Sequence, residues 1–220
     1  MIELPDFSKT YDYENYFYWT CDNQRIGKFL AQYELYKISK DVEGAIVECG
    51  VFKGASLIRF ATFRNLFSNP KTKKIIGFDS FAEFPQTDFE PDQKMRTDFI
   101  EESGEQSISV DQLSHVLKNK KLDENVELIA GNITETIPEY IKKNPDLKIS
   151  LLNLDVDIYE PSVTALEYLF PRLQKGGILI LDDYQYFPGE TKAVDDYFKD
   201  KNVNIQKFPS SRTPSYLIKQ

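Results

Sequence analysis

The stretch AIVECGVFKGAS, residues 45–56, decides the fold of this chain. Its apolar first half predicts a buried strand, and Gly50 and Gly54 predict a tight turn before a helix that opens at Ser56. An apolar strand that leads into a glycine turn and then a helix is how α/β proteins bring their backbone close to a cofactor. Glu48, at the end of the strand, places an acid at that turn.

Apolar strands alternate with helices along the rest of the chain. The predicted strands are 45–49, 74–78, 126–130, 149–154, 178–181, 203–208 and 216–218, and the predicted helices are 23–40, 56–67, 110–120, 134–143, 161–173 and 191–199. Lys175, Gly176 and Gly177 should close the helix 161–173. This alternation predicts an α/β fold with a mostly parallel seven-stranded sheet and helices on both faces. The length of 220 residues suits one domain, 1–220.

Two segments lie outside the alternation. Residues 1–43 should form an N-terminal cap, in which the helix 23–40 shows helical spacing of Ile26, Phe29, Leu30, Tyr33 and Tyr36. Tyr11–Trp19 is rich in aromatic residues without a clear period. We expect this segment either to pack on the domain or on a neighbouring subunit, or to cover a substrate pocket. Residues 81–104 read as an irregular, proline- and acid-rich insertion on the substrate side.

Composition excludes several classes of function. A net charge of −8 argues against binding to nucleic acid, which requires clustered lysine and arginine. No apolar run approaches the roughly 18 residues that span a membrane, and residues 1–10 lack the pattern of a signal peptide. We expect Cys21 and Cys49 to be reduced and the protein to be cytoplasmic.

Acids stand at the ends of four of the first five predicted strands. They are Glu48, Asp79, Asp155 and Asp182. Ligands of parallel sheets bind outside the carboxyl ends of the strands, so these four side chains should face one crevice.

The first two acids indicate the kind of cofactor. Asp79 ends the second strand, where an acid can accept hydrogen bonds from the two hydroxyls of a ribose. The turn between Gly50 and Gly54 does not match G-x-G-x-x-G, and Glu48 would repel a pyrophosphate but suits an α-amino group. S-adenosylmethionine (SAM) carries both an α-amino group and a ribose.

The later acids indicate a metal site. Asp155 and the pair Asp182–Asp183 follow strands that should be neighbours, and oxygen-only ligands favour Mg²⁺ or a similar cation. Without a cation, some of these carboxyl groups would have to be protonated. Asp157, two residues after Asp155, either reaches the substrate or caps the next helix.

Five motifs in order resemble those of the SAM-dependent sugar O-methyltransferases of the macrocin and mycinamicin type. They are VECGVFKGAS (47–56), GFDSFAEFP (77–85), GNITETIPEY (131–140), LNLDVDIYEPSVTALEYLFPRLQKGGILILDDY (152–184) and PGETKAVDDYF (188–198). The order of five motifs is far more specific than any one of them. The resemblance implies a Rossmann-like class I methyltransferase fold.

The resemblance also implies the site residues. Glu48 and Gly50 would meet the methionine part of SAM, with Gly54 and Ser56 completing the turn; Asp79, Ser80 and Phe81 would meet the ribose, and Asn132 and Ile133 the adenine. Asp155, Asp182 and Asp183 match the metal ligands, which would hold the hydroxyl to be methylated. Asp155 is our candidate for the base as well, because the histidine that some members place after the DD pair is absent. The one histidine, His115, is expected on an outer helix face.

The resulting hypothesis is metal-dependent transfer of a methyl group from SAM to a hydroxyl of a sugar, either nucleotide-linked or part of a glycoside. The alternatives are an O-methyltransferase of a phenol or catechol and a SAM-binding protein without turnover. The expected partner is a small sugar-containing acceptor, with no nucleic acid and no membrane. The aromatic N-terminus favours a homo-oligomer, a dimer or larger.

Overall fold

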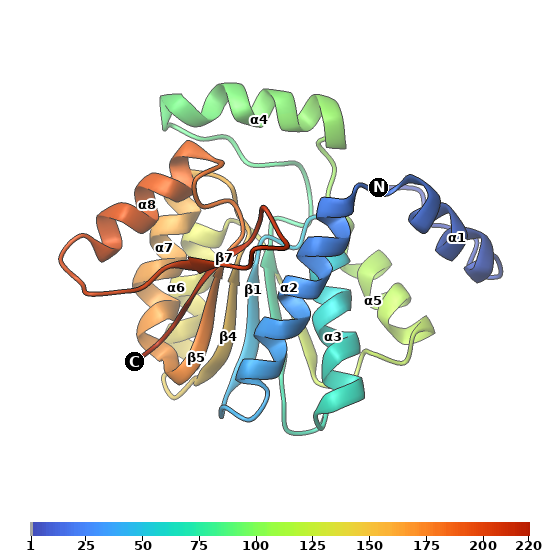
Figure 1. The fold of residues 1–220 in the computed structure, drawn as a ribbon, viewed down its shortest axis with the longest axis horizontal. Coiled ribbons are helices and arrows are strands. Elements are labelled where there is room, and N and C mark those ends of the chain that lie inside the picture. Colours follow the sequence, from blue (N-terminus) through green and yellow to red (C-terminus); the bar gives the residue numbers. More distant parts are fainter. Residues whose placement is uncertain (1) are drawn as a thin grey trace.

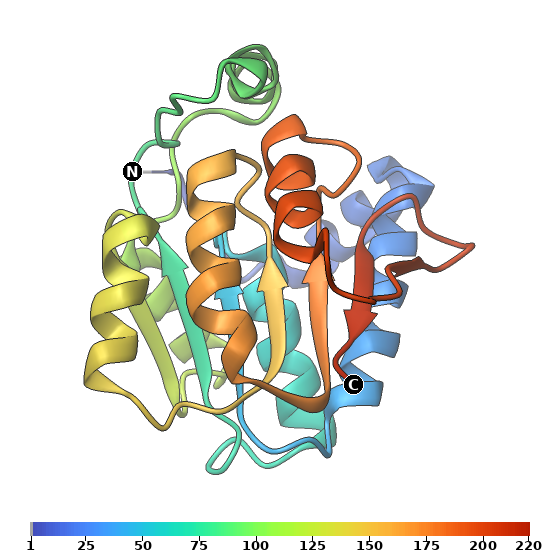
Figure 2. The ribbon, with the colours of Figure 1, turned by 90° about the vertical axis from the view of Figure 1, so that its left-hand side faces the viewer.

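A seven-stranded sheet forms the centre of the molecule, and helices cover both of its faces (Figure 1, Figure 2). The structure is a computed structural model that describes residues 2–220. The strands are β1 (Ala45–Cys49), β2 (Ile75–Asp79), β3 (Val126–Ala130), β4 (Ile149–Leu154), β5 (Leu173–Leu181), β6 (Gln206–Lys207) and β7 (Ser215–Ile218). Their order is β3-β2-β1-β4-β5-β7-β6; the first five are parallel, and β7 is antiparallel to both neighbours. The predicted mostly parallel sheet is confirmed.

Six of the described helices form two layers, one on each face of the sheet, and α1 (Thr10–Thr20) and α4 (Glu90–Ser103) belong to neither. The six are α2 (Asn23–Ser39), α3 (Ala55–Phe67), α5 (Val110–Asn119), α6 (Ile133–Lys143), α7 (Tyr159–Leu169) and α8 (Pro188–Phe198), with a short 3₁₀ turn at Phe170–Arg172 after α7. Apolar residues of α2, α3 and α5 form one core with the sheet, and those of α6, α7 and α8 form the other. The strands are apolar on both sides because both faces are covered.

One predicted boundary is wrong. Lys175–Gly177 does not close the preceding helix, because α7 ends at Leu169 and β5 already begins at Leu173. The pairing of β4 with β5 shifts register between Ile149 and Leu151, and Gly176 has a φ of +80° opposite that shift. The glycine pair therefore forms a bulge in a long strand.

The insertion is also more regular than the sequence indicated. Residues 90–103 form the helix α4, which lies across one end of the molecule (Figure 1). Its proline lies in the first turn, where a missing N–H costs nothing, and Glu90 and Asp92 favour the positive end of the helix dipole. Asp92 is buried and accepts hydrogen bonds from the backbone N–H of Gly189, at 2.6 Å, and of Tyr159, at 3.0 Å. These bonds fix α4 to the starts of α7 and α8.

The helix α2 was predicted to within one residue, but only part of its apolar stripe is buried. Tyr36 is fully buried, whereas Phe29 and Leu30 are 40% and 46% exposed. Toward its N-terminus the inward position is Gly27, which faces the carbonyl of Ser210 so closely that a Cβ would lie 2.5 Å from the oxygen. The stripe is therefore buried at Tyr36 and points partly outward at Phe29 and Leu30.

The aromatic N-terminal segment is a helix that projects from the domain (Figure 1). Within the described chain, none of the side chains of α1 is buried, and Tyr11 and Trp19 are 80% and 73% exposed. Packing of α1 on its own domain therefore does not account for the aromatic residues.

Gly50 lies where the ends of β1 and β4 touch. A Cβ at this position would lie 1.6 Å from the carbonyl oxygen of Asp155, and the φ of Gly50 is +87°. The N–H of Gly50 donates to Phe78, and that of Asp155 donates to Cys49, so both residues continue the ladder beyond the strands. Only glycine allows this approach.

We predict that Gly50→Ala lowers the free energy of unfolding by about 3 kcal/mol or more, because the Cβ adds a backbone clash to an unfavourable φ. That corresponds to a loss of about 6 °C or more in melting temperature for a chain of this size. Gly176→Ala is the control, since its φ is +80° but its Cβ would meet only Val42, at 3.7 Å. Equal losses for the two variants, measured by calorimetry, would contradict the role given to the contact with Asp155.

Candidate active site

A cavity of about 1360 Å³ opens at the carboxyl ends of the parallel strands. Of the predicted site residues, it is lined by Gly50, Ser56, Asp79, Ser80, Asn132, Ile133, Asp155, Asp182 and Asp183, with Glu48, Gly54 and Phe81 behind its wall. Segments outside the strands supply the rest, notably α4 and the loop 212–213. A site for one small ligand has about 300–1,000 Å³, so this cavity has room for two reactants. No residue of α1 lines it within the described chain.

Three carboxylates converge at the end of β4 and β5. Asp155, Asp157 and Asp183 each offer an oxygen, and these oxygens lie within 4.8 Å of one another. Asp157 has a φ of +63°, an unusual value that turns the chain sharply after β4. The convergence of Asp155 with Asp183 was expected, and Asp157 joins them.

Buried negative charge raises the pKa values in this cluster. Burial and then the charge of Asp182 raise the pKa of Asp155 well above its usual range, and burial and then the charge of Asp157 do the same for Asp183. Burial, together with the charge of Asp155, raises the pKa of Asp157 to about 8, although a hydrogen bond with Asp183 opposes the shift. A bound cation would reverse these shifts, because it favours the ionised carboxylates.

Asp182 has a different neighbour. Its Oδ2 lies 2.5 Å from the Nζ of Lys28, on α2, and the same Nζ lies 4.0 Å from Oδ2 of Asp155. Burial alone would lower the pKa of Lys28, but the charges of Asp182 and Asp155 outweigh it and raise that pKa. The other oxygen of Asp182, Oδ1, is buried and finds no partner among residues 2–220. The side-chain ammonium group of Lys28 therefore pairs with Asp182 and lies near Asp155, two acids that the sequence analysis had assigned to a metal.

A further acid supports the cluster from α8. Glu190 is fully buried, and its Oε1 accepts a hydrogen bond of 3.0 Å from the N–H of Asp183. Its own N–H donates to the carbonyl of Asp157. Burial and the charge of Asp183 raise the pKa of Glu190. Glu190 therefore holds the backbone of Asp157 and Asp183 in place.

Glu48 lies under the glycine turn. It is 1% exposed and accepts a hydrogen bond from the hydroxyl of Ser56, while its Oε2 has no partner among the described residues. Burial raises the pKa of Glu48 to about 8, against the effects of Ser56 and of the charge on Lys28. A buried carboxylate oxygen without a donor fits a ligand that brings an N–H or ammonium group.

Asp79 organises the turn around it. Its Oδ2 accepts hydrogen bonds from the N–H of Val51, at 2.7 Å, and of Phe52, at 2.9 Å. Its Oδ1 accepts from the N–H of Phe81, at 2.6 Å, and from the hydroxyl of Ser107, at 3.0 Å. Phe52 and Phe81 both have positive φ, so these bonds hold two strained residues.

The sequence reasoning missed Lys28, Arg59 and Glu190. A signal existed for Lys28, which stands three, four and seven residues before the buried Ala31, Gln32 and Leu35 on the inner stripe of α2. Arg59 lines the cavity from α3 and donates a hydrogen bond to Gln32. Glu190 lies within a motif that the sequence had singled out, but nothing in the motif indicated that its side chain is buried.

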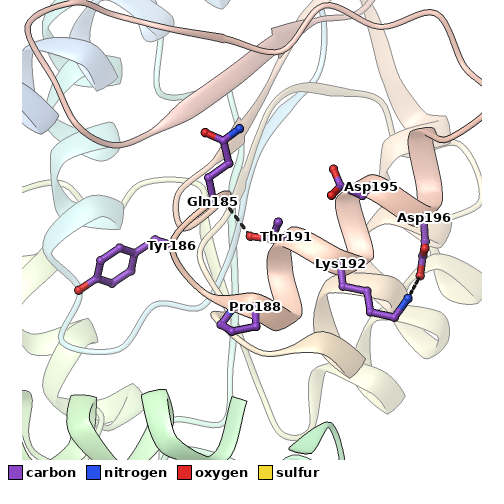
Figure 3. A pocket seen from close by; sticks show the side chains of 7 residues that line it. All are labelled: Gln185, Tyr186, Pro188, Thr191, Lys192, Asp195 and Asp196. Atoms are coloured by element: carbon purple, nitrogen blue, oxygen red, sulfur yellow. Dashed lines mark hydrogen bonds and ion pairs between the residues drawn. The ribbon is translucent and has the colours of Figure 1, made fainter. Parts of the chain in front are cut away.

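A second hollow, of about 460 Å³, lies at the start of α8 (Figure 3). Its polar groups mostly satisfy one another: the hydroxyl of Thr191 accepts from the N–H of Gln185, and Lys192 pairs with Asp196. Its two acids, Asp195 and Asp196, are chain neighbours on α8, and Asp195 accepts a hydrogen bond from the hydroxyl of Tyr184. His115 lies exposed on α5, where Asn119 is its hydrogen-bond partner. Among the described helices, none combines the length and the apolar character needed to cross a membrane.

We predict that the cation-free protein loses stability as the pH rises from about 5 to about 8. The pKa of Glu48 is raised from 4.5 to about 8 in the folded state, so the folded chain holds a proton that the unfolded chain has released. Each pH unit in that window then lowers the free energy of unfolding by up to about 1.4 kcal/mol per such group. Asp157 acts in the same direction.

Thermal unfolding in EDTA across this pH range measures the effect. Glu48→Gln should flatten the slope, and the exposed Glu34→Gln should leave it unchanged. A melting temperature that rises with pH, or a slope that Glu48→Gln does not alter, would contradict the raised pKa.

Solved structures with this architecture are methyltransferases. The calicheamicin methyltransferase CalS11 has a TM-score of 0.80 at 28% identity, with 95% of this chain and 85% of that chain covered. The O-methyltransferase NovP has a TM-score of 0.74 at 24% identity, with 89% and 80% covered, and supports the fold alone. The expected Rossmann-like class I methyltransferase fold is confirmed.

Curated relatives share part of their length with this chain. An 8-demethyl-8-(2,3-dimethoxy-alpha-L-rhamnosyl)-tetracenomycin-C 4'-O-methyltransferase of Streptomyces olivaceus is 29% identical over 73% of this chain and 60% of its own. The mycinamicin III 3''-O-methyltransferase of Micromonospora griseorubida is 29% identical over 71% of this chain and 61% of its own. The chain thus spans about three-fifths of these relatives. The model of the macrocin-O-methyltransferase (TylF) family matches residues 12–208, so the chain belongs to that family.

Proposed function

We propose that this protein transfers a methyl group from SAM to a hydroxyl of a sugar, nucleotide-linked or part of a glycoside, with the help of a divalent cation. The observation that carries the proposal is the convergence of Asp155, Asp157 and Asp183 beside the glycine turn, in one cavity with room for two reactants. The relatives that are named for methylation of glycosylated compounds support the choice of a sugar hydroxyl.

The methyl donor is proposed to lie over β1 and β2. Oε2 of Glu48 would accept from its α-amino group, with Gly50 beside it and with Gly54 and Ser56 shaping the turn. Oδ1 of Asp79 would accept from a ribose hydroxyl in place of Ser80, whose contact of 3.4 Å is the longest that this oxygen makes. Phe81 would support the ribose from behind. Asn132 and Ile133, at the start of α6, would flank the adenine.

The acid cluster fits a hard divalent cation such as Mg²⁺. Its donors are carboxylate oxygens only, they are close together, and Oδ1 of Asp182 lacks a partner among the described residues. Asp155, Asp182 and Asp183 are the proposed ligands. Asp182 lies outside the three converging carboxylates and pairs with Lys28 through Oδ2, so it would offer its unpartnered Oδ1 or exchange Lys28 for the cation. Bound there, the cation would lower the pKa of a coordinated hydroxyl.

Asp155 and Asp157 are the two candidates for the group that accepts the proton of that hydroxyl. A carboxylate that is committed to a cation is a weaker base, which disfavours Asp155. Asp157 lies in the same cluster but is not one of the proposed cation ligands. We therefore propose Asp157 as the base, held by the bond from the N–H of Glu190 to its carbonyl. The chain's remaining contribution is to position the two reactants and exclude water.

We predict that Asp155→Asn lowers methyl transfer by about 100-fold or more, because it removes both a cation ligand and a negative charge beside the reacting hydroxyl. Affinity for SAM, measured by calorimetry, should stay within about threefold, since the residues proposed to bind SAM lie elsewhere in the cavity. Asp196→Asn is the control, because Asp196 is exposed on α8 and pairs with Lys192.

Methyl transfer is followed with radiolabelled SAM on nucleotide-linked sugars, glycosides and catechols, with Mg²⁺ or with EDTA. Transfer at the wild-type rate by Asp155→Asn, or in EDTA, would refute the role of the cation. Methylation of the catechols alone would refute the sugar. SAM binding without any transfer would favour a protein without turnover.

We further propose that the protein is a homo-oligomer in which α1 packs on a second copy of the chain. An isolated helix of 11 residues is marginal in water, and α1 exposes Tyr11, Tyr16, Phe17, Tyr18 and Trp19. A contiguous apolar surface of this kind is typical of a protein interface.

We predict that the double change Tyr11→Glu and Trp19→Glu converts the oligomer into a monomer, because it places charges in the buried surface. Light scattering after size-exclusion chromatography measures the mass. Tyr168→Glu is the control, since Tyr168 is 40% exposed on α7. A monomeric wild-type protein, or an unchanged mass in the double variant, would refute the interface.

A further inference from the structure

The first turns of α2 deliver an ammonium group into the acid cluster. Nζ of Lys28 lies 2.5 Å from Asp182 and 4.0 Å from Asp155, and the side chains of Lys28 and Asp182 are only 18% and 4% exposed. Within residues 2–220, it is the one side chain that forms an ion pair with these acids.

The fold itself gives no reason for a lysine at this position. Lys28 belongs to the inner stripe of α2, next to Gly27, Ala31 and Leu35, where an apolar side chain of similar length would pack. Moving a lysine out of water is unfavourable unless a negative partner compensates for it. The acids at the sheet edge are that partner, so the position of Lys28 is explained by the cluster.

The ammonium group and a divalent cation would compete for the same two carboxylates. Asp155 and Asp182 are two of the three proposed cation ligands, and Lys28 contacts both. A cation at Asp155 and Asp182 would lie within a few ångströms of Nζ, and two positive charges at that distance repel each other strongly in a buried site.

We propose that Lys28 is the resident counter-ion of the acid cluster: it holds Asp155 and Asp182 in the cation-free protein and is displaced when a divalent cation binds. This inference rests on the cation site of the proposed function. Lys28 is then a positioning residue. It lowers the affinity of the site for the cation, and in the absence of a cation it offsets the repulsion between the carboxylates of Asp155 and Asp182.

The inner end of α2 is fixed by few other contacts. Oε1 of Gln24 accepts a hydrogen bond of 2.9 Å from the N–H of Arg212, and Gly27 packs on the carbonyl of Ser210. Gln24, Arg25 and Lys28 line the cavity together with Arg212. Displacement of Lys28 would therefore break the ion pair that connects this wall of the cavity to Asp182, directly after β5.

The test uses Mn²⁺ as the probe and Lys28→Met, Lys28→Arg and Lys37→Met as variants. Lys37 lies on the same helix but is exposed and pairs with Glu34, so it is the matched control. Calorimetric titration should show that Lys28→Met binds Mn²⁺ at least about tenfold more tightly than wild type, because the competing charge is gone. In EDTA, Lys28→Met should melt at a lower temperature than wild type, Lys28→Arg should be near wild type, and Mn²⁺ should restore Lys28→Met.

The outcomes separate the two proposals. If wild type binds Mn²⁺ and Lys28→Met binds it equally or more weakly, Lys28 is not a competitor, whereas the cation site stands. If neither protein binds Mn²⁺, both proposals are overturned. If only Lys28→Met binds Mn²⁺, the competition is supported.

A second measurement covers the case in which Lys28→Met fails to fold. Wild-type protein is treated with an amine-reactive acetylating reagent, and the modification of each lysine is followed by mass spectrometry. Mn²⁺ should increase the labelling of Lys28 severalfold and leave that of Lys37 unchanged. Equal or lower labelling of Lys28 with Mn²⁺ bound would overturn its displacement.

Discussion

Uncompensated negative charge at the carboxyl edge of the sheet is the constraint on which the site depends. Besides Asp79, six carboxyl groups lie at or under this edge: Glu48, Asp155, Asp157, Asp182, Asp183 and Glu190. Buried carboxylates so close together are not all ionised unless cations accompany them. Lys28 offsets part of this charge, and the raised pKa values of Glu48 and Asp157 indicate that bound protons offset another part. If positively charged ligands replace both, as we propose, their binding is linked to folding stability.

The topology explains why the charge collects at one edge. Parallel strands end on the same side, and the ladder continues past β1, β4 and β5 through Gly50, Asp155 and Asp182. The close approach at Gly50 brings the glycine turn, the proposed place of the methyl donor, against Asp155, the proposed place of the acceptor. Transfer of a small group between two reactants requires such proximity, and the rigid sheet supplies it without movement of the strands.

Residues on strands were predictable from the sequence, and residues that act from helices were not. Asp155, Asp182 and Asp183 follow apolar runs whose parallel pairing could be read from the alternation, so the convergence of Asp155 with Asp183 followed from the fold alone. Asp182 does not join them and pairs with Lys28 instead. Asp157 depends on a positive φ that spacing does not reveal, and the burial of Glu190 depends on how α8 packs. The helical spacing of Lys28 relative to Ala31 and Leu35 could have placed it on the inner face, but the apolar residues Phe29 and Leu30 indicated another face, and both are exposed. Asp79 was expected to face a ribose, and its four backbone and hydroxyl donors could be seen only in three dimensions.

The α4 side of the cavity is joined to the sheet by a small number of polar contacts. Asp92 ties α4 to Tyr159 and Gly189, and Glu160 accepts hydrogen bonds from Asp88 and Phe89. Asp92 is buried and Glu160 is partly buried, while no residue of α4 takes part in the apolar cores. Loops and added helices can change without disturbing a packed core. If the function is as proposed, the sheet edge positions the methyl donor and the acids, whereas α4 and the loop 210–213 can vary to select the acceptor.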